Sequence, residues 1–205
     1  METIKLGNSK SLVIAQVFGT SRPLLYGLFA GVGRPLALLS DGIELRAALL
    51  VIEALTWSAV DWMDSMHELM THPSLSVPLL EHLSPEDILS RVAHDGRFSG
   101  IMRGFGPSFQ ALPCIFTNAN AKLALAEYVR MLDVSNLPLA LQQLSALSVL
   151  LLCATHEPDQ PAFDFYLGHL PTCIYRTMII LNNFLDDDNH KVLLVRGVWL
   201  LMLLT

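Results

Sequence analysis

The sequence has few charged residues. Asp, Glu, Lys and Arg make up 16% of its 205 residues, whereas an average soluble domain has about a quarter. With so few charges, several helices must be buried on most of their sides, or must face a larger partner or a membrane. Lys and Arg are scattered along the chain, and the net charge is −6. Nucleic-acid binding requires a basic patch that neutralises phosphates, so we expect no nucleic-acid partner.

Cysteines are also few. Cys114, Cys153 and Cys173 lie in apolar surroundings and show no CxxC spacing. An odd, unpatterned number indicates reduced core thiols in a cytoplasmic protein rather than a disulfide framework or a zinc site. The apolar run from Leu12 to Phe18 is short and lacks a small-residue cleavage pattern. We therefore predict no signal peptide and a cytoplasmic location.

Motifs that would name a chemistry are missing. The run Gly104–Pro107 has neither the GxGxxG spacing nor the Gly-Lys-Ser/Thr ending of a phosphate-binding loop. There is no nicotinamide fingerprint, and no Ser and His are spaced as in an acyl-transfer triad. By motif, the sequence assigns neither a catalytic residue nor a cofactor-binding residue.

No segment alternates apolar and polar residues as a strand does, so we predict an all-α fold with about six helices in two layers. We divide the chain into a weakly patterned segment, 1–22, and a single domain, 23–205. The longest uncharged run, Leu137 to Thr155, is about as long as a bilayer requires. Pro138 and several polar residues interrupt it, so we favour a buried helix over a membrane span.

Apolar spacing and capping residues place the helices. A long helix is expected over Ile43–Met66, with Leu45, Leu49, Ile52, Leu55 and Ala59 on its buried face. Other helices are expected at Pro85–Ala93 after the cap Ser84, at Asn118–Leu132 with Leu123 inward, at Leu139–Ala154, from His169 to Phe184 with a kink at Pro171, and at Lys191–Thr205 after the acidic cap 186–188.

The segment Phe163–Thr172 carries one imidazole among aromatic side chains. On a helix, Phe165 and His169 would stack on one side. His169 is either a core histidine bonded to a backbone carbonyl or a ligand, and the residue pattern favours the first. His67, His72 and His82 lie near several prolines, so we expect solvent-facing loop positions rather than metal ligands.

The chain stops inside an apolar run, Leu200–Thr205, with no polar tail or cap. Such an end leaves carbonyls and an apolar face without partners, so we expect the domain to be incomplete at its C-terminus.

The run LFAGVGRPLALLSDGIEL (28–45) is similar to the segment LFAG-x-x-HP-x-IH-L-G-x-G-x-E of the questin oxidase-like family of filamentous fungi. Four further segments resemble the same family. In the same order come PEDILSRVAHDGRF (85–98), YVRMLDVSNLPLALQQL (128–144), and FDFYLGHLPT with HKVLLVRGVWLL (163–172, 190–201). The last pair resembles the family's FDFFL-x-H-x-x-T helix and its sequel.

The resemblance implies an oxidoreductase of fungal polyketide metabolism that opens a ring of anthraquinone-type substrates. The reaction is described as Baeyer–Villiger-like or dioxygenase-like, with NADPH associated with some members. Part of the family uses a non-haem iron held by several histidines and a carboxylated lysine. An aromatic cavity in an all-α protein would suit a flat polycyclic substrate.

The ligand positions that the resemblance implies are only partly kept. His169 matches the histidine of the FDFFL-x-H helix and is our one candidate metal ligand. Arg34 and Leu38 stand where the HP-x-IH segment has histidines. Neither side chain has a lone pair that could bind iron. One imidazole does not hold iron against water and cellular ligands, so we expect neither iron nor NADPH to be retained.

These residues leave three hypotheses. The chain is an oxidoreductase of this family; or it is a catalytically silent homologue that binds an apolar metabolite or a partner subunit; or it is a helical membrane-associated scaffold.

Overall fold

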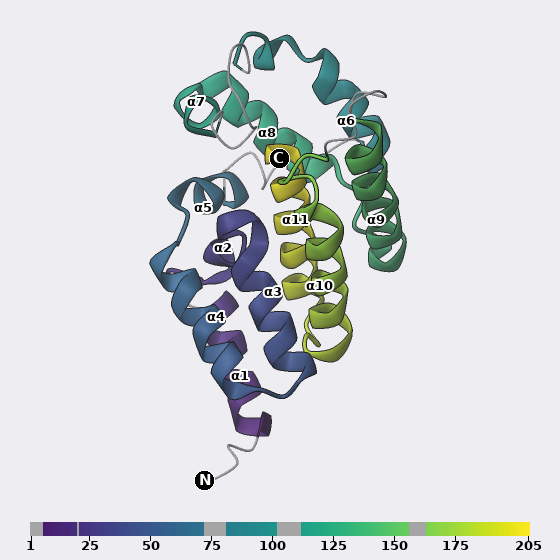
Figure 1. The fold of residues 1–205 in the computed structure, drawn as a ribbon. Coiled ribbons are helices and arrows are strands. Elements are labelled where there is room, and N and C mark those ends of the chain that lie inside the picture. Colours follow the sequence, from purple (N-terminus) through teal and green to yellow (C-terminus); the bar gives the residue numbers. More distant parts are fainter. Residues whose placement is uncertain (1–5, 20, 72–80, 102–111, 156–162) are drawn as a thin grey trace.

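A computed structural model describes residues 6–19, 21–71, 81–101, 112–155 and 163–205, and all regular secondary structure in these ranges is helical (Figure 1). The elements are α1 (Leu6–Phe18), α2 (Leu25–Leu28), α3 (Ala30–Glu44), α4 (Ala48–Val60), α5 (Asp64–Met70), α6 (Pro85–His94), the 3₁₀ helix η2 (Gly96–Phe98), α7 (Leu112–Thr117), α8 (Ala119–Met131), α9 (Leu137–Ala154), α10 (His169–Asn183) and α11 (Asp188–Leu204). The all-α class is confirmed. The expected number of about six helices is wrong, since the described residues alone form eleven α-helices.

The helix expected over Ile43–Met66 is the main source of the error. α3 ends at Glu44, and Arg46 takes a left-handed conformation with φ of 54°. The N–H of Ala47 donates to the carbonyl of Gly42, and the N–H of Arg46 to that of Ile43. This pair of bonds is a Schellman motif. It turns the chain so that α4 packs back along α3 (Figure 1).

The buried face expected for that helix is also wrong. Leu45, Leu49 and Ile52 are 69%, 80% and 55% exposed. The turn at Arg46 changes the direction of the helix, so Ala54 and Ser58 become the residues that α4 buries against α2 and α3.

A second left-handed turn precedes the regular part of α3. Gly31, Val32 and Gly33 have φ of 54°, 59° and 79°, and a β-branched residue in this region is rare. A Cβ at Gly33 would lie 2.5 Å from Sγ of Cys173. The turn therefore requires glycine at 33, and it brings the start of α3 against α10.

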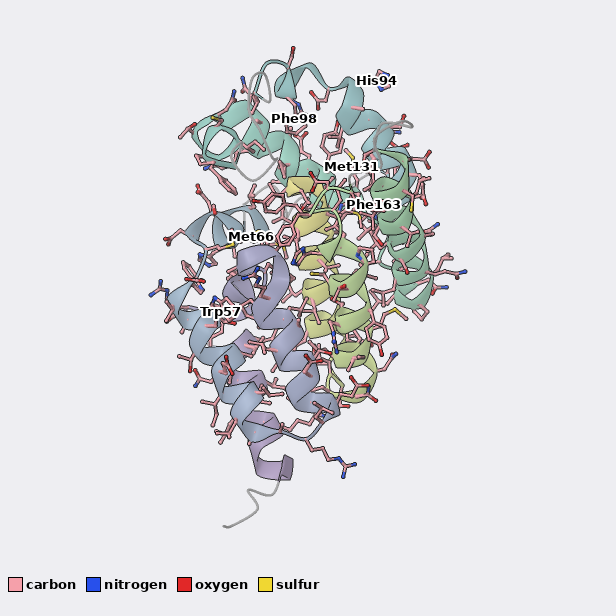
Figure 2. All side chains as sticks on the ribbon, in the orientation of Figure 1. Trp57, Met66, His94, Phe98, Met131 and Phe163 are labelled. Atoms are coloured by element: carbon pink, nitrogen blue, oxygen red, sulfur yellow. The ribbon has the colours of Figure 1, made fainter. Side chains whose placement is uncertain are left out.

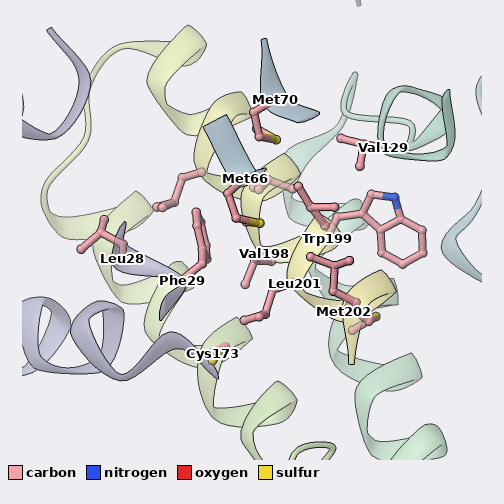
Figure 3. Packing of buried hydrophobic residues seen from close by; sticks show 14 of the residues in the cluster. Leu28, Phe29, Met66, Met70, Val129, Cys173, Val198, Trp199, Leu201 and Met202 are labelled. Carbon is pink, nitrogen blue, oxygen red and sulfur yellow. The ribbon is translucent and has the colours of Figure 1, made fainter. Parts of the chain in front are cut away.

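α11 forms the centre of the packing (Figure 3). Trp199 is fully buried, and its indole N–H donates to the carbonyl of Tyr128 on α8 over 3.1 Å. On another side of α11, Gly197 lies against the ring of Phe29, where a Cβ would clash. Met66 and Val198 lie near Phe29 in the same cluster (Figure 3).

α9 buries one side only. Ala140, Leu141, Leu144, Leu147 and Ser148 are buried, while Leu139, Val149 and Leu150 are 48%, 49% and 57% exposed. Side chains project outward along this helix (Figure 2). Among the described residues it is the helix that is long and apolar enough to cross a membrane, and 28% of it is buried in the fold. The prediction of a helix buried on most of its sides is therefore wrong for α9.

Local capping was predicted well. Ser84 caps α6 by accepting from the N–H of Asp87, and Asp187 caps α11 by accepting from the N–H of His190. Asn118, which we expected to be the first residue of its helix, is instead the residue that caps α8. The expected kink at Pro171 is wrong, because α10 begins at His169 and a proline in the first turn breaks no intrahelical bond.

Two further positions differ from expectation. Leu123, expected to face inward, is 38% exposed. The buried face of α8 is formed instead by Ala121, Ala124, Leu125, Ala126, Tyr128, Val129 and Arg130. The weak pattern of 1–22 did not predict a helix, yet Leu6–Phe18 forms α1 and buries Val13 and Val17.

Candidate functional site

His169 is the first residue of α10. Its Nδ1 lies 2.8 Å from the carbonyl oxygen of Phe165, and the Phe165 ring meets the imidazole edge-on with centroids 4.6 Å apart. The expected bond to a backbone carbonyl is confirmed. Because that carbonyl only accepts, a neutral His169 carries its proton on Nδ1 and its lone pair on Nε2.

The aromatic core expected around His169 is wrong. Phe163 and Phe165 are each 60% exposed, and the imidazole itself is half-buried. These aromatic residues precede α10 in a turn, where Asp164 accepts from the N–H groups of Tyr166 and Leu167. His169 thus lies at the surface end of a helix rather than inside the fold.

Arg34 and Leu38 lie on α3. The exposed Arg34 side chain folds over Gly31, and Leu38 is half-buried against the core one turn later. Since Gly33 touches Cys173, Arg34 and His169 lie at the same end of the α3–α10 pair. The chain thus brings the regions of all three family positions to neighbouring helices.

These residues do not fit an iron site. Arg34 and Leu38 supply no ligand, and the described residues contain no group of three His, Cys, Asp or Glu side chains that converges to hold a metal ion. A stable iron site needs several nitrogen or oxygen donors at once. These residues therefore give no support to a chemical step at an iron ion.

The other candidate histidines are dispersed. His67 lies on α5, not in a loop, and packs against Tyr26 and Trp62 with ring centroids 4.9 and 5.2 Å away. His82 is exposed before α6. His72 lies outside the described residues, as does the run Gly104–Pro107.

Sequence reasoning missed a polar network at the end of α6. Asp95 accepts from Arg97 at 2.7–3.1 Å and from the hydroxyl of Tyr128 at 2.9 Å. Arg97 also donates to Glu127 over 2.6 Å. The hydrogen bonds from Arg97 lower the pKa of Asp95 to about 2, and burial raises the pKa of Tyr128 above its usual range. Asp95 is thus ionised at neutral pH, and its role here is to tie α6 and η2 to α8.

A pair of arginines was missed as well. Arg130 is buried at the end of α8, and Arg196 is half-buried on α11. Burial, together with the nearby Arg130 charge, lowers the pKa of the Arg196 guanidinium. Nε of Arg196 is buried and has no hydrogen-bond partner within the described ranges.

A pocket of about 610 Å³ lies where α9, α10 and α11 meet, and we call it the α9–α10–α11 pocket. Its lining is Val134, Ser135, Asn136, Leu137, Pro138, Leu141, Met178, Leu181, Asn182, Asp188, Lys191 and Val192. Ligand pockets commonly enclose about 300–1,000 Å³. Met178 is nine residues beyond His169 on the same helix, or about 13 Å along its axis. The pocket and His169 therefore lie at different positions along α10.

The family model described as questin oxidase-like matches residues 2–205, nearly the whole chain. The chain belongs to the questin oxidase-like family. The resemblance seen in the five segments is thereby confirmed, and the family name suggests an oxidoreductase. No curated protein matches the chain. Within this questin oxidase-like fold, the positions occupied by Arg34, Leu38 and His169 come from the paired helices α3 and α10.

Proposed function

We propose that this protein is a cytoplasmic oxidoreductase that oxidatively opens a ring of flat polycyclic substrates of the anthraquinone type, as part of fungal polyketide metabolism. The observation that carries the proposal is the family match over residues 2–205. A Baeyer–Villiger-like opening places one atom of O2 in the ring and takes two electrons from a reductant such as NADPH to reduce the other atom to water, whereas a dioxygenase-like opening places both atoms in the substrate.

The α9–α10–α11 pocket is the substrate site in this proposal. Leu141, Met178 and Leu181 offer apolar contacts to a planar ring system, while Asn136 and Asn182 offer amide groups to quinone and phenol oxygens. A pocket with apolar walls and a few polar groups is the usual form of a small-molecule site. The volume and this mixed lining support the substrate class.

Binding without turnover is the second candidate. Arg34 and Leu38 supply no ligand where the family segment has histidines, and no three donors converge among the described residues. A catalytically silent homologue would keep the pocket and lose the oxidation. A partner subunit that supplies donors in trans would restore the oxidation.

One experiment separates these candidates. Purified protein is titrated with a soluble anthraquinone, followed by its visible absorbance, and oxygen uptake is then measured with Fe(II) and NADPH present. Binding with oxygen uptake and a ring-opened product supports the oxidoreductase. Binding without uptake supports the silent homologue, and the absence of binding contradicts both.

Two variants locate the binding. Met178→Trp fills the α9–α10–α11 pocket from a side chain that is 37% exposed, so we expect the fold to tolerate it and the affinity to fall about tenfold or more. Val149→Trp on α9 is the matched control, since this exposed residue does not line the pocket. An equal loss of affinity in both variants, or no loss in either, would show that the substrate binds elsewhere.

The membrane-associated scaffold is tested in the same preparation. α9 passes the length and composition test for a span. A protein that leaves the membrane fraction only with detergent would favour the scaffold over both small-molecule hypotheses.

A further inference from the structure

A second cavity, of about 170 Å³, lies between α1, α3 and α4 and is bordered by Phe184. We call it the α1–α4 cavity. It shares no lining residue with the α9–α10–α11 pocket. A ligand can therefore occupy this cavity whether or not the protein catalyses the proposed oxidation.

The turn at Arg46 creates the walls of this cavity. Because the Schellman motif sends α4 back along α3, Ile43 and Val51 come to line the same space as Val13 of α1. Gly42 permits the close approach, since a Cβ there would lie 2.7 Å from Cγ2 of Val51. The result is a cavity whose walls are almost entirely aliphatic, with Phe184 at one side.

The rim of the cavity is apolar as well. Leu12 and Ile52 line it and are 67% and 55% exposed, and Leu45 and Leu49 beside them are 69% and 80% exposed. Four large aliphatic residues in one exposed region are more than the scattered apolar residues that a soluble surface normally carries. A chain-like apolar ligand would cover this rim on entering.

Two cations are the charged groups that line the cavity. Lys10 pairs with Asp186 over 2.7 Å and lies 5.8 Å from the centre of the Phe184 ring. Arg46 is exposed, and its guanidinium makes no hydrogen bond or ion pair with a described residue. The nearby carboxylate of Glu44 is directed to Arg176 instead, over 3.6 Å. Arg46 is thus a cation beside an apolar cavity with no carboxylate of its own.

We propose that the α1–α4 cavity binds the aliphatic chain of a free medium-chain fatty acid, whose carboxylate pairs with Arg46. The volume fixes the length: a cavity of about 150 Å³ holds benzene, so one of this size takes about six carbons. The remaining carbons cover the leucine rim. Charge complementarity fixes the head, because a guanidinium binds carboxylates well.

An anionic bilayer fits the same surface less well. Two cations give weak attraction to a charged membrane, and the chain as a whole carries −6. The cavity is a concave aliphatic cleft that is open at the exposed Leu12 and Ile52, and this form suits a single chain rather than a flat lipid surface.

Calorimetric titration with butanoate, hexanoate, octanoate and dodecanoate, each below its micelle concentration, tests the proposal. The affinity should rise about fourfold per added methylene while the chain fills the cavity, then level off near eight carbons. 1-Octanol should bind about two- to fivefold more weakly than octanoate, because it leaves Arg46 unpaired. Affinity that ignores chain length, or octanol that binds as tightly as octanoate, overturns the proposal.

Variants separate the cavity from the charge. Ile52→Trp should fill the mouth and reduce octanoate affinity at least tenfold, whereas Val60→Trp, on the same helix, 77% exposed and outside the lining, should leave it unchanged. Arg46→Gln should remove the difference between octanoate and octanol, and Arg46→Lys should keep it. Circular dichroism checks that each variant is folded.

Binding to lipid vesicles distinguishes a free fatty acid from a membrane surface as the ligand. Phosphatidylglycerol vesicles should not bind the protein, and octanoate should not require them. Binding to vesicles that Ile52→Trp and Arg46→Gln abolish, together with no binding of monomeric octanoate, would assign the surface to a membrane and overturn the fatty-acid site.

Discussion

Helices α9 and α11 have nearly the same length and are both strongly apolar, yet they lie in opposite environments. α11 contacts α5, α8, α9 and α10 and buries Trp199 completely. α9 has packed helices on one side and exposes Leu150 to 57% on the other. The difference teaches that burial is set by how many neighbours the topology places around a helix, which apolar composition alone does not report.

Truncating one large side chain on each helix should give the largest contrast. Trp199→Ala removes a buried indole and its hydrogen bond to Tyr128, so the free energy of unfolding should fall by about 3–5 kcal/mol. Leu150→Ala on α9 should change it by less than about 0.5 kcal/mol. Urea unfolding followed by circular dichroism measures both values. Similar losses would show that α9 is covered in solution.

Adding a single methyl group sharpens the contrast at smaller scale. Gly197→Ala on α11 places a Cβ against the Phe29 ring, so it should destabilise the fold by about 1–3 kcal/mol. Gly96→Ala in η2 meets nothing within 4 Å and should cost less than about 0.5 kcal/mol. If the two changes had equal effects on the urea midpoint, the close packing of α11 against Phe29 would be refuted.

The effect of pH on stability should also differ between the surroundings of α11 and those of α9. Tyr128 links α11 to Asp95, because its carbonyl accepts from Trp199 and its hydroxyl donates to Asp95. α9 contains no Asp, Glu, His, Lys or Arg. The pKa of Asp95 is about 2 in the fold, below its usual 3.8, so its stabilisation is full above pH 4 and is lost as the pH falls from 3.8 toward 2.

Asp95→Asn should therefore destabilise the fold by about 1–2 kcal/mol at pH 7 and by much less near pH 2. Unfolding curves of both proteins from pH 7 to pH 2 provide the measurement. A difference that stays constant over this range would mean that the ionised carboxylate of Asp95 does not stabilise the fold.

The features that the sequence predicted are local ones. Ser84 and Asp187 cap helices that begin at the next residue, and His169 bonds to a carbonyl four residues earlier. These contacts depend on residues only two to four apart, which a pattern reports directly.

The features that it missed depend on distant residues or on an uncommon choice of residue. The Schellman motif at Arg46 has arginine where glycine is usual, so no breaker marked the turn. Asp95 meets a partner 33 residues away. The α9–α10–α11 pocket joins side chains from three helices, and no single segment carries its pattern.

The close contact between α3 and α10 also makes Cys173 a natural reporter of how often these two helices separate. The thiol of Cys173 donates a hydrogen bond to the carbonyl of Val32, and burial raises the pKa of the thiol to about 12. Cys153 is exposed and Cys114 is partly so. An alkylating reagent should therefore modify Cys153 at once, and Cys173 only when α3 separates from α10. Mass spectrometry of the Cys173 peptide over time would report how often the two helices part, without any probe being introduced.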